Sequence, residues 1–511
     1  MNLFSLESTK KFSPLVLDYI NEDEKLKFFY NRYPSFSNFK KQIEEKKTQS
    51  IERSVLFDVL KHQNANLQLT SSSLKNLNNL KKQNTFTVTT GHQLCLFSGP
   101  LYFIYKIIST INLAEKLKKE FSDYNFVPVF WMASEDHDFE EINHINLFGK
   151  KIQWDSKQTG PVGRMKLDGM DIVLDELKSY IGSSNNANKL IEIFNNAYLS
   201  CNNIADATRE VVNSLFGEYG LLILDGDDAS LKKMMYNIIK QDVEESKFYN
   251  ILKKTSSDLS KNYKVQARVN KINFFELVDS SRIRIETNKS ISSPIETYSP
   301  NVLLRPIFQE IIMPNIAYVG GGAEIAYWMQ LKGVFEKEKI VFPILVLRNS
   351  CLILDEKKTA RIEKLNLELK DIFLDNDDLQ KKYIKSISVN DLALNKEKDD
   401  VKKVYDLLLE RFNDAGIESS IKAEQTKNLN ALDKLSKKIT RLEKKKNLLE
   451  LTQISNLKEQ LFPFNKLQER HDNFISYYIK YGENFIKKLK KDLNPLEPKF
   501  VVLSFKQEED E

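Results

Sequence analysis

Three carboxylates and a histidine stand side by side in one stretch of this sequence. Glu135, Asp136, His137 and Asp138 follow an apolar run at residues 126–133. Carboxylates held this close repel one another, so we expect a cation among them, either a substrate ammonium group or magnesium. The acids also suit the first turn of a helix, where negative charge is favourable, and both interpretations can hold together. We interpret the loop as part of a functional site.

A second candidate loop follows the β-branched run at residues 86–90. Its candidate residues are Gly91, His92, Gln93, Ser98 and Gly99. Pro100 suits the first turn of the helix that we expect next, and a helix N-terminus attracts phosphate or carboxylate. We therefore predict nucleotide or anion binding at the glycines and the serine, and a hydrogen bond from His92 to a phosphate in a transition state. His92 could equally cap the strand end or be exposed.

A third element is the glycine turn in YVGGGAEIAYW, residues 318–328. It matches neither the GxxxxGKS nor the GxGxxG pattern, although it resembles a phosphate-cradling turn that leads into a helix. Its candidate binding residues are Tyr318, Gly320, Gly321, Gly322 and Glu324. Glycines let the backbone approach a ligand closely, and Glu324 would take a ribose hydroxyl or a substrate amine. The alternative is close packing of helix on strand. Trp328 is expected in the core.

Two arginines and a set of histidines complete the candidates. Arg305 precedes a proline and Arg348 closes a strand, so both are candidate carboxylate clamps, with ordinary ion pairs as the alternative. A zinc site was considered because His92, Cys95, His137 and His144 lie close in sequence. Their spacing matches no known ligand pattern, so zinc is not expected and no metal ligand is assigned.

These loops need strands to position them. Apolar runs at residues 86–90, 127–133, 221–224, 316–319 and 342–347 read as buried strands, and several are followed by helical patterns. Helices are expected at 229–249, 323–335 and 471–491. Strands alternating with helices predict an α/β fold with a Rossmann-like, doubly wound parallel sheet. Ligands bind such sheets beyond the carboxyl ends of the strands, where the polar loops fall.

The composition divides the chain into three regions. Residues 1–354 are predicted to form the catalytic core, with N-terminal helices and insertions near 150–217 and 250–300; 355–495 form a helical coiled-coil region, and 496–511 a terminal strand returning to the core and an acidic tail. Apolar residues at heptad spacing run from Leu432 to Leu449, interrupted by Lys446. This favours a helical hairpin or a short antiparallel coiled coil, which we expect to form a homodimer.

Composition also excludes some classes of protein. The net charge of +5 is the remainder of 76 basic and 71 acidic side chains, which gives no case for nucleic-acid binding. No apolar run approaches the ~20 residues of a membrane helix, and no signal peptide is visible. Three scattered cysteines make no disulfide framework. We expect a cytoplasmic protein that binds neither membrane nor nucleic acid.

Four long motifs resemble one family. TTGHQLCLFSGPLYFIYK, PVFWMASEDHDFEEINH, RPIFQEIIMPNIAYVGGGAEIAYW, and FPFNKLQER with FISYYIKYG are similar to the bacillithiol biosynthesis cysteine-adding enzymes, the BshC family. The similarity covers nearly the whole chain. It implies a Rossmann-like core with two connecting insertions, as in class I aminoacyl-tRNA synthetases, and a coiled coil used for dimerisation. It also implies a cysteine ligase that joins the carboxyl group of cysteine to the amine of glucosaminyl-malate.

The resemblance places the first loop, the acidic loop and the glycine turn at the family's site, while Arg305, Tyr318 and Arg348 are candidates from the residues alone. The candidate catalytic residues are His92, Gln93, Asp136, His137 and Asp138, and the candidate substrate-binding residues are Glu135, Arg305, Tyr318, Glu324 and Arg348. Many family members carry glutamine in place of His92. An amide formed from a free carboxylate needs an activated acid, an adenylate or an acyl phosphate, so ATP with magnesium is expected. His137 or Asp136 would deprotonate the amine.

Two other functions stay open from the sequence. One is a nucleotidyltransferase-like enzyme that uses the same loops on another small substrate. The other is a non-catalytic coiled-coil scaffold with a degenerate Rossmann core. The acidic loop argues against a binder of phosphate backbones, because Glu135, Asp136 and Asp138 would repel it.

Overall fold

The computed structural model describes residues 1–388, 391–412 and 414–506, and the acidic tail beyond 506 lies outside them. The chain divides into two compact units. Unit 1 comprises Met1–Leu352 and Gln468–Leu503, and unit 2 comprises Ile353–Leu467 and Ser504–Lys506. The chain passes from unit 1 into unit 2 within strand β12 (Ser350–Leu354).

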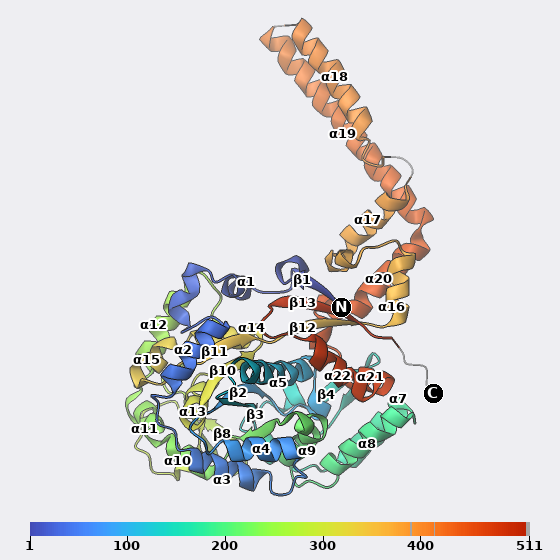
Figure 1. Cartoon of the computed structure of the whole chain (residues 1–511). Helices are drawn as coiled ribbons and strands as arrows, with labels where there is room; N and C mark the ends of the chain where they lie inside the picture. The colour runs from blue at the N-terminus through green and yellow to red at the C-terminus, as the bar shows by residue number, and fades with distance from the viewer. Residues whose placement is uncertain (389–390, 413, 507–511) are drawn as a thin grey trace. The chain divides into compact units, whose positions relative to one another are not determined.

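A five-stranded parallel sheet forms the centre of unit 1. Figure 1 shows its strands β2, β3, β10 and β11 between helices. Its strands are β2 (Thr85–His92), β3 (Asn125–Met132), β6 (Leu222–Asp225), β10 (Asn315–Gly320) and β11 (Ile344–Leu347). The strand order is β11-β10-β2-β3-β6, with neighbours parallel. Starting from β2, the chain adds β3 and β6 on one side and β10 and β11 on the other. The predicted doubly wound, Rossmann-like sheet is therefore confirmed.

Helices cover both faces of this sheet, which explains why its strands are almost wholly apolar. Helix α5 (Tyr102–Glu120) joins β2 to β3 and packs with α2 (Phe36–Lys46) over one face, in a cluster that includes Phe126 and Val319. The neighbouring strand residues Val127 and Tyr318 point to the opposite cluster. That cluster also holds residues of α3 (Arg53–Gln63) and α13 (Arg305–Ile312).

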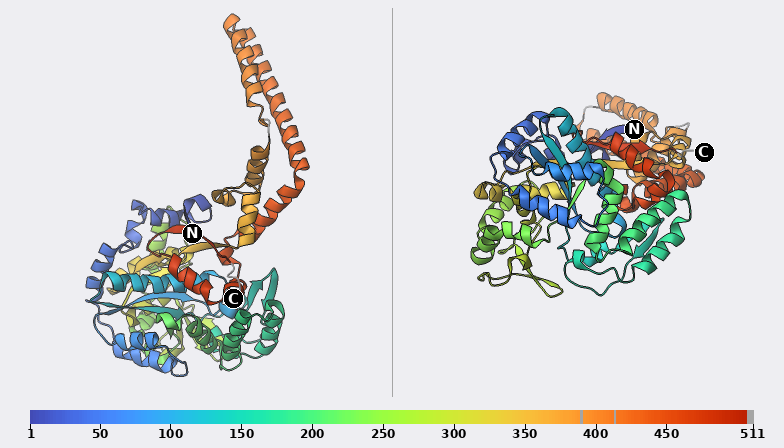
Figure 2. Two further views of the ribbon diagram at one scale, coloured as in Figure 1. Left: turned by 45° about the vertical axis from the view of Figure 1, so that its right-hand side comes forward. Right: turned by 60° about the horizontal axis from the view of Figure 1, so that its bottom comes forward.

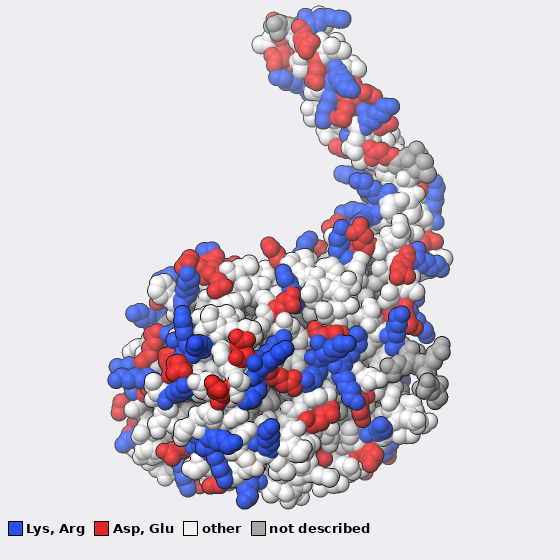
Figure 3. All heavy atoms as spheres, viewed as in Figure 1, with Lys and Arg blue, Asp and Glu red and all other residues white. Residues whose placement is uncertain are grey.

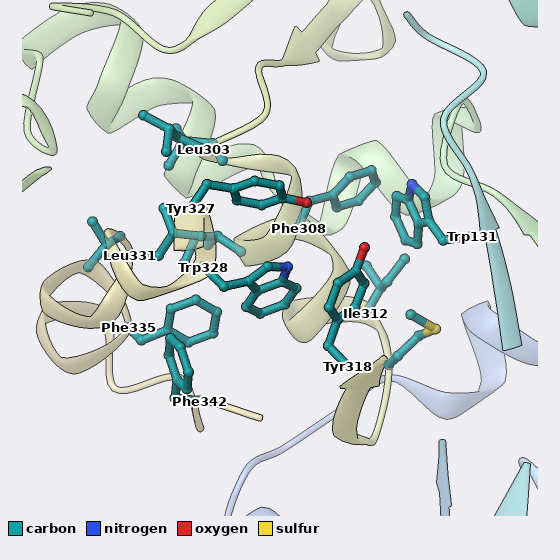
Figure 4. Close-up of a cluster of buried hydrophobic side chains, with 14 of the residues drawn as sticks. Trp131, Leu303, Phe308, Ile312, Tyr318, Tyr327, Trp328, Leu331, Phe335 and Phe342 are labelled. Carbon is teal, nitrogen blue, oxygen red and sulfur yellow. The ribbon is translucent and has the colours of Figure 1, made fainter. Parts of the chain in front are cut away.

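Aromatic side chains concentrate in the second cluster (Figure 4). The rings of Tyr318 and Trp328 lie 4.6 Å apart, and Trp131 meets Phe308 edge to face. Trp328 is fully buried, as expected from the sequence, whereas Tyr327 is 8% exposed. The packed aromatic side chains of this cluster therefore support the carboxyl end of β10.

The predicted N-terminal helices pack on the sheet. They are α1 (Pro14–Ile20), α2, α3 and α4 (Ser71–Asn79). Tyr19 of α1 donates a hydrogen bond to the carbonyl of Leu345 on β11, at 2.6 Å. Because this partner lies on the edge strand, α1 is tied directly to the sheet.

Three predicted helices are each broken in two. They are α10 (Ala229–Met234) with α11 (Tyr236–Glu245), α14 (Gly322–Met329) with α15 (Lys332–Glu338), and α21 (Ile475–Tyr481) with α22 (Glu483–Asp492). At the second break the Gln330 side chain bonds both backbone groups of Ala267 and the Ser256 hydroxyl. At the third, Gly482 adopts a positive φ of 55°, which ends α21. Helical periodicity continues across such breaks, so the sequence did not reveal them.

The two expected insertions have different structures. Around 150–217, a β4–β5 hairpin (His144–Leu147, Lys150–Gln153) precedes α7 (Met170–Ile181), α8 (Asn185–Tyr198) and α9 (Ile204–Phe216). Near 250–300, α12 (Tyr249–Ser260) leads into an antiparallel sheet of order β8-β7-β9. Its strands are β7 (Phe274–Val278), β8 (Ser281–Arg284) and β9 (Tyr298–Pro300). The second insertion thus contains a small three-stranded antiparallel sheet.

Another small sheet brings together both ends of the chain. In it β13 (Lys499–Ser504) pairs antiparallel with β1 (Asn2–Ser5), in the order β1-β13-β12. The terminal strand expected at 500–505 is thus present.

Unit 2 is helical, with α16 (Glu356–Lys364), α17 (Asn376–Ile387), α18 (Asn395–Arg411), α19 (Ala415–Lys446) and α20 (Leu448–Leu461). Helices α18 and α19 lie side by side in Figures 1 and 2. Lys398 pairs with Asp433 and Tyr405 with Asn428, so the two helices run antiparallel. The structure therefore contains the helical hairpin that the interrupted heptad repeat predicts.

Charges of both signs are interspersed on the face of the molecule that Figure 3 shows. This agrees with the near balance of acidic and basic side chains. Of the helices in the described ranges, none has the length and apolar character that a membrane crossing requires.

Candidate functional site

A cavity of about 970 Å³ lies at the carboxyl ends of β2, β3 and β10. The first loop contributes Gly91, His92 and Gln93, and the acidic loop Glu135 and Asp136. The glycine turn contributes Tyr318, Gly321, Gly322 and Glu324, and the two expected arginines, Arg305 and Arg348, also line it. The cavity lining does not include Ser98, Gly99, His137, Asp138 or Gly320.

The first loop begins later than the sequence suggested. Gly91 and His92 still belong to β2, paired with Trp131 and Met132 of β3. A Cβ at position 91 would lie in ordinary contact with the Tyr318 hydroxyl, at 3.4 Å, so Gly91 is close to the end of the neighbouring strand β10.

The helix after this loop also starts later. Pro100 forms an isolated bridge with Asn473, and the Leu101 N–H donates to the Asp472 carbonyl at 2.7 Å. Asn473 donates to the Gly99 carbonyl at 2.7 Å, and Ser98 is 6% exposed. The expected placement of Pro100 in the first helical turn is wrong, because the segment at 472–473 pairs with this backbone. Anion binding by Ser98 and Gly99 stays a prediction.

A buried lysine connects the first loop to the glycine turn. Lys106 of α5 donates to the Gly91 carbonyl at 2.6 Å and pairs with Glu324 at 2.6 Å. Glu324 also accepts from the Tyr318 hydroxyl at 2.6 Å and from the Gly321 N–H at 2.8 Å. Burial alone would raise the pKa of Glu324, but Lys106 and these donors hold that pKa below its usual value. Glu324 thus caps α14 as a carboxylate, the packing role foreseen as the alternative.

An aromatic ring separates His92 from Arg348. The Tyr102 ring lies 5.2 Å from the His92 ring and 5.1 Å from the Arg348 guanidinium. Burial, with Lys106 and Arg348 nearby, lowers the pKa of His92 well below its ordinary value. His92 is therefore neutral at physiological pH, and its buried Nε2 has no hydrogen-bond partner within the described residues. A neutral imidazole here can exchange hydrogen bonds with a ligand but does not add a charge.

The two expected arginines are held differently. Arg348 donates to Glu469 at 2.6 Å, an ion pair that is 4% and 1% exposed at its side chains, while its Nε lacks a partner among the described residues. Arg305 donates to Gln309 at 3.0 Å and lies over the rings of Trp131 and Tyr318. Its buried Nη2 is likewise unpaired in the described chain. Both arginines therefore keep a donor that an anion in the cavity could use.

Part of the negative charge of the acidic loop is neutralised by a side chain of the same protein. Glu135 pairs with Lys232 at 2.6 Å, and Lys232 also binds Asp227, which in turn holds Arg164. Burial raises the pKa of Glu135; Lys232 opposes that shift and the Asp227 charge adds to it. Lys232 is thus a cation of this chain beside Glu135, and a substrate ammonium group or magnesium at the acidic loop stays a prediction.

Asp136 has a different environment. Gln93 donates to Asp136 at 2.8 Å and to Glu141, which lies in the short helix after the loop, at 2.6 Å. His137 lies 3.2 Å from an Arg282 nitrogen, and Asp138 is exposed where the short α6 (Phe139–Ile142) begins. Asp136 also accepts from the His137 N–H at 2.8 Å, and the His137 ring nitrogen lies 3.7 Å from its carboxylate. Of the three expected carboxylates, Asp136 is the one that lines the cavity and pairs with no lysine or arginine among the described residues.

The zinc alternative has no support in geometry. Cys95 is buried, and burial raises its pKa to about 12, so it is a thiol rather than a thiolate. Within the described ranges, no three or more His, Cys, Asp or Glu side chains gather as metal ligands would.

Family models match both parts of the chain. The Bacillithiol biosynthesis BshC N-terminal Rossmann-like domain matches residues 1–293 and 286–349, and the BshC C-terminal coiled-coil domain matches 351–505. The chain belongs to the BshC family.

Curated relatives extend over the full length. A protein of Flavobacterium johnsoniae is 40% identical over 98% of this chain and 99% of its own, and one of Bacillus cytotoxicus is 25% identical over 93% and 95%. Both are named "Putative cysteine ligase BshC". This shared name identifies the chain as an enzyme of the ligase class. Among solved structures, a Campylobacter jejuni protein titled "putative arginyl t-RNA synthetase" aligns at 9% identity over 84% of this chain and 100% of that one, with a TM-score of 0.24, which carries no argument.

Sequence reasoning missed several charged residues of this BshC-family cavity. Lys106, Arg268, Arg282, Arg284 and Arg470 all line it. Lys106 could have been found, because it interrupts the otherwise apolar start of a helix that follows a strand. The β7–β8 hairpin carries Arg282 and Arg284, and nothing in its local pattern indicated that it reaches the sheet edge.

Proposed function

We propose that this protein joins the carboxyl group of cysteine to the amine of glucosaminyl-malate, which forms the amide of bacillithiol. The observation that carries the proposal is the charge pattern of the cavity. Asp136 offers a carboxylate to an ammonium group, while Arg305 and Arg348 offer donors to an anionic one. Family membership and the name shared by the relatives support cysteine and bacillithiol as the chemistry.

On the amine side, Asp136 is the proposed base. Gln93 holds its carboxylate within the cavity and leaves lone pairs free. The ammonium proton passes to Asp136, and the free nitrogen attacks the activated carbonyl carbon of cysteine. The C–N bond forms as the bond to the leaving group breaks, and the nitrogen releases its second proton to water, so that a neutral amide remains. His137 is the weaker candidate, because its Nδ1 faces the Arg282 guanidinium and the residue does not line the cavity.

On the carboxyl side, the free acid must be activated because amide formation is uphill in water. ATP with magnesium is the proposed activator, and it would supply the leaving group. The free donors of Arg305 and Arg348 and the neutral His92 suit its phosphates or the developing oxyanion. Magnesium bound together with phosphates needs only one or two protein carboxylates, a role that fits Glu141.

The deciding experiment is mass spectrometry on purified protein with glucosaminyl-malate, cysteine and magnesium, with and without ATP. We expect the amide only with ATP, and release of pyrophosphate or of phosphate would identify an adenylate or an acyl phosphate. Absence of product under both conditions, from folded protein, would contradict the proposal and favour a nucleotidyltransferase-like enzyme acting on another substrate.

We also propose a homodimer formed through the hairpin of α18 and α19. Neither helix has a buried residue, and Leu407 and Leu442 are 63% and 60% exposed. Apolar side chains at heptad spacing on such a surface favour a second helical partner. The variant Leu435→Glu with Leu442→Glu should halve the mass found by light scattering. Lys438→Glu, on the same helix, is the matched control and should leave the mass unchanged; a monomeric wild type would contradict the proposal.

A further inference from the structure

Two arginines of the β7–β8 hairpin lie against the same aromatic ring, that of Phe275, in the lining of the cavity. Arg284 lies directly opposite Phe275 in the strand register, and the guanidinium carbons of Arg282 and Arg284 lie 4.0 Å and 4.4 Å from the centre of that ring. All three residues line the cavity, and Phe275 is 6% exposed. The ring therefore holds two guanidinium groups close together at a fixed place.

These two positive charges have no carboxylate partner within the described residues. Arg282 donates to the Ser299 hydroxyl at 3.1 Å and to the Pro300 carbonyl at 2.8 Å, both neutral, and it faces His137. Arg284 takes part in no hydrogen bond or ion pair of its side chain among the same residues. Like charges this close repel each other, so an arrangement that holds them together is suited to a ligand with two negative groups.

The arginine pair adjoins the acidic loop. The Arg282 nitrogen that lies 3.2 Å from His137 places the pair next to Asp136, the neighbouring residue of that loop. Burial lowers the pKa of Arg282, while the charges of Glu135 and Asp136 oppose that shift. One wall of the cavity thus presents carboxylates and, immediately beside them, two guanidinium groups.

We propose that Arg282 and Arg284 form the subsite for the two carboxylates of the malate group of the acceptor. The inference rests on the proposed function. Glucosaminyl-malate carries its amine on the sugar carbon next to the one that bears malate, so its ammonium group and its carboxylates must be recognised by adjacent side chains. Asp136 beside the arginine pair meets that requirement. The phosphates of a nucleotide are the other anion of suitable chemistry, and the test separates the two.

The test is isothermal titration calorimetry on the full-length protein, because binding needs no turnover. Arg284→Gln should raise the Kd for glucosaminyl-malate at least tenfold and leave the Kd values for ATP and cysteine within twofold. Methyl glucosaminide, which keeps the amine but lacks malate, should bind the wild type and the variant equally weakly. Ile283→Gln is the matched control: Ile283 lies between the two arginines on β8 but does not line the cavity, and its variant should bind as the wild type does.

Two results would overturn the assignment: an unchanged Kd for glucosaminyl-malate in Arg284→Gln, or a loss confined to ATP, which would assign the arginines to phosphate. Arg284→Lys should fall between wild type and Arg284→Gln, since it keeps the charge but loses the two-pronged donor. Acceptor binding by a wild type that forms no amide would refute the proposed reaction but not this subsite.

Discussion

The cavity contains two groups of charged side chains that differ in whether their charges are paired within the chain. The sheet-edge cluster (Lys106, Glu324 and Arg348) is buried, and each of its charges pairs with another charge of the chain. The hairpin pair (Arg282 and Arg284) is held against Phe275 and pairs with no carboxylate among the described residues. A buried charge is too costly without a partner. Arg284 is exposed, and the half-buried Arg282 bonds only neutral groups and faces His137. Lys106 and Glu324 therefore maintain the shape of the site, Arg348 combines an ion pair with an Nε that is unpaired among the described residues, and the hairpin pair is available for recognition.

Asp136 lies between these two groups, and its loss should have the largest effect. Asp136→Asn removes the proposed base and the carboxylate that receives the ammonium group, while Gln93 can still bond the amide oxygen, so kcat should fall about 10²–10⁴-fold and KM for the acceptor should rise. Steady-state kinetics of amide formation measure this. Glu140→Gln, an exposed acid of the same loop that does not line the cavity, should retain wild-type kinetics. A kcat near that of the wild type in Asp136→Asn would exclude Asp136 as the base.

Removing a charge from the sheet-edge cluster should lower the stability of the fold. Lys106→Met leaves Glu324 buried without its cation and frees the Gly91 carbonyl, so the free energy of unfolding should drop by about 3 kcal/mol in urea titrations. Arg284→Met, the comparison from the hairpin pair, should change it by no more than about 0.5 kcal/mol. Equal losses in the two variants would show that the distinction between the groups is wrong.

A buried carboxyl group behind the hairpin offers a smaller, pH-dependent effect. Asp242 of α11 accepts the Asn273 N–H at 2.5 Å, and Asn273 in turn holds Asn301 at the cavity. Burial raises the pKa of Asp242 to about 7. The unfolded chain releases this proton near pH 4 and the folded chain near pH 7, so the stability that the group contributes below pH 4 is lost as the pH rises through 7.

Asp242→Asn should remove the loss of stability that the wild type shows as the pH rises through 7. At pH 8 the variant should be more stable than the wild type by about 2 kcal/mol, and the difference should shrink or reverse at pH 5. Thermal or urea unfolding across this pH range measures it. A constant difference between the two proteins at every pH would mean that Asp242 does not titrate as its burial indicates.

Much of the fold was predictable because it depends on local pattern. Runs such as 127–133, with polar residues directly after them, indicated strands buried on both faces, and parallel β2 and β3 follow from the helix between them. The places that failed are those where distant residues intervene. The side chain of Gln330 reaches Ala267 where α14 ends, and the segment at 472–473 pairs with the backbone ahead of α5.

The sequence by itself determined that this is a BshC-family chain with a parallel sheet, polar loops at one edge of that sheet and a helical hairpin, since these depend on residue type and spacing. Only the tertiary structure decided which charges face the cavity. Glu135 and Glu324 line the cavity as expected, but each also pairs with a lysine that the sequence did not indicate, Lys232 and Lys106, and their binding of a substrate stays a prediction. Arg282 and Arg284, distant in sequence, lie beside Asp136. The physical reason is that a charge is neutralised by whatever lies within a few ångströms in space, and that neighbour can come from any part of the chain.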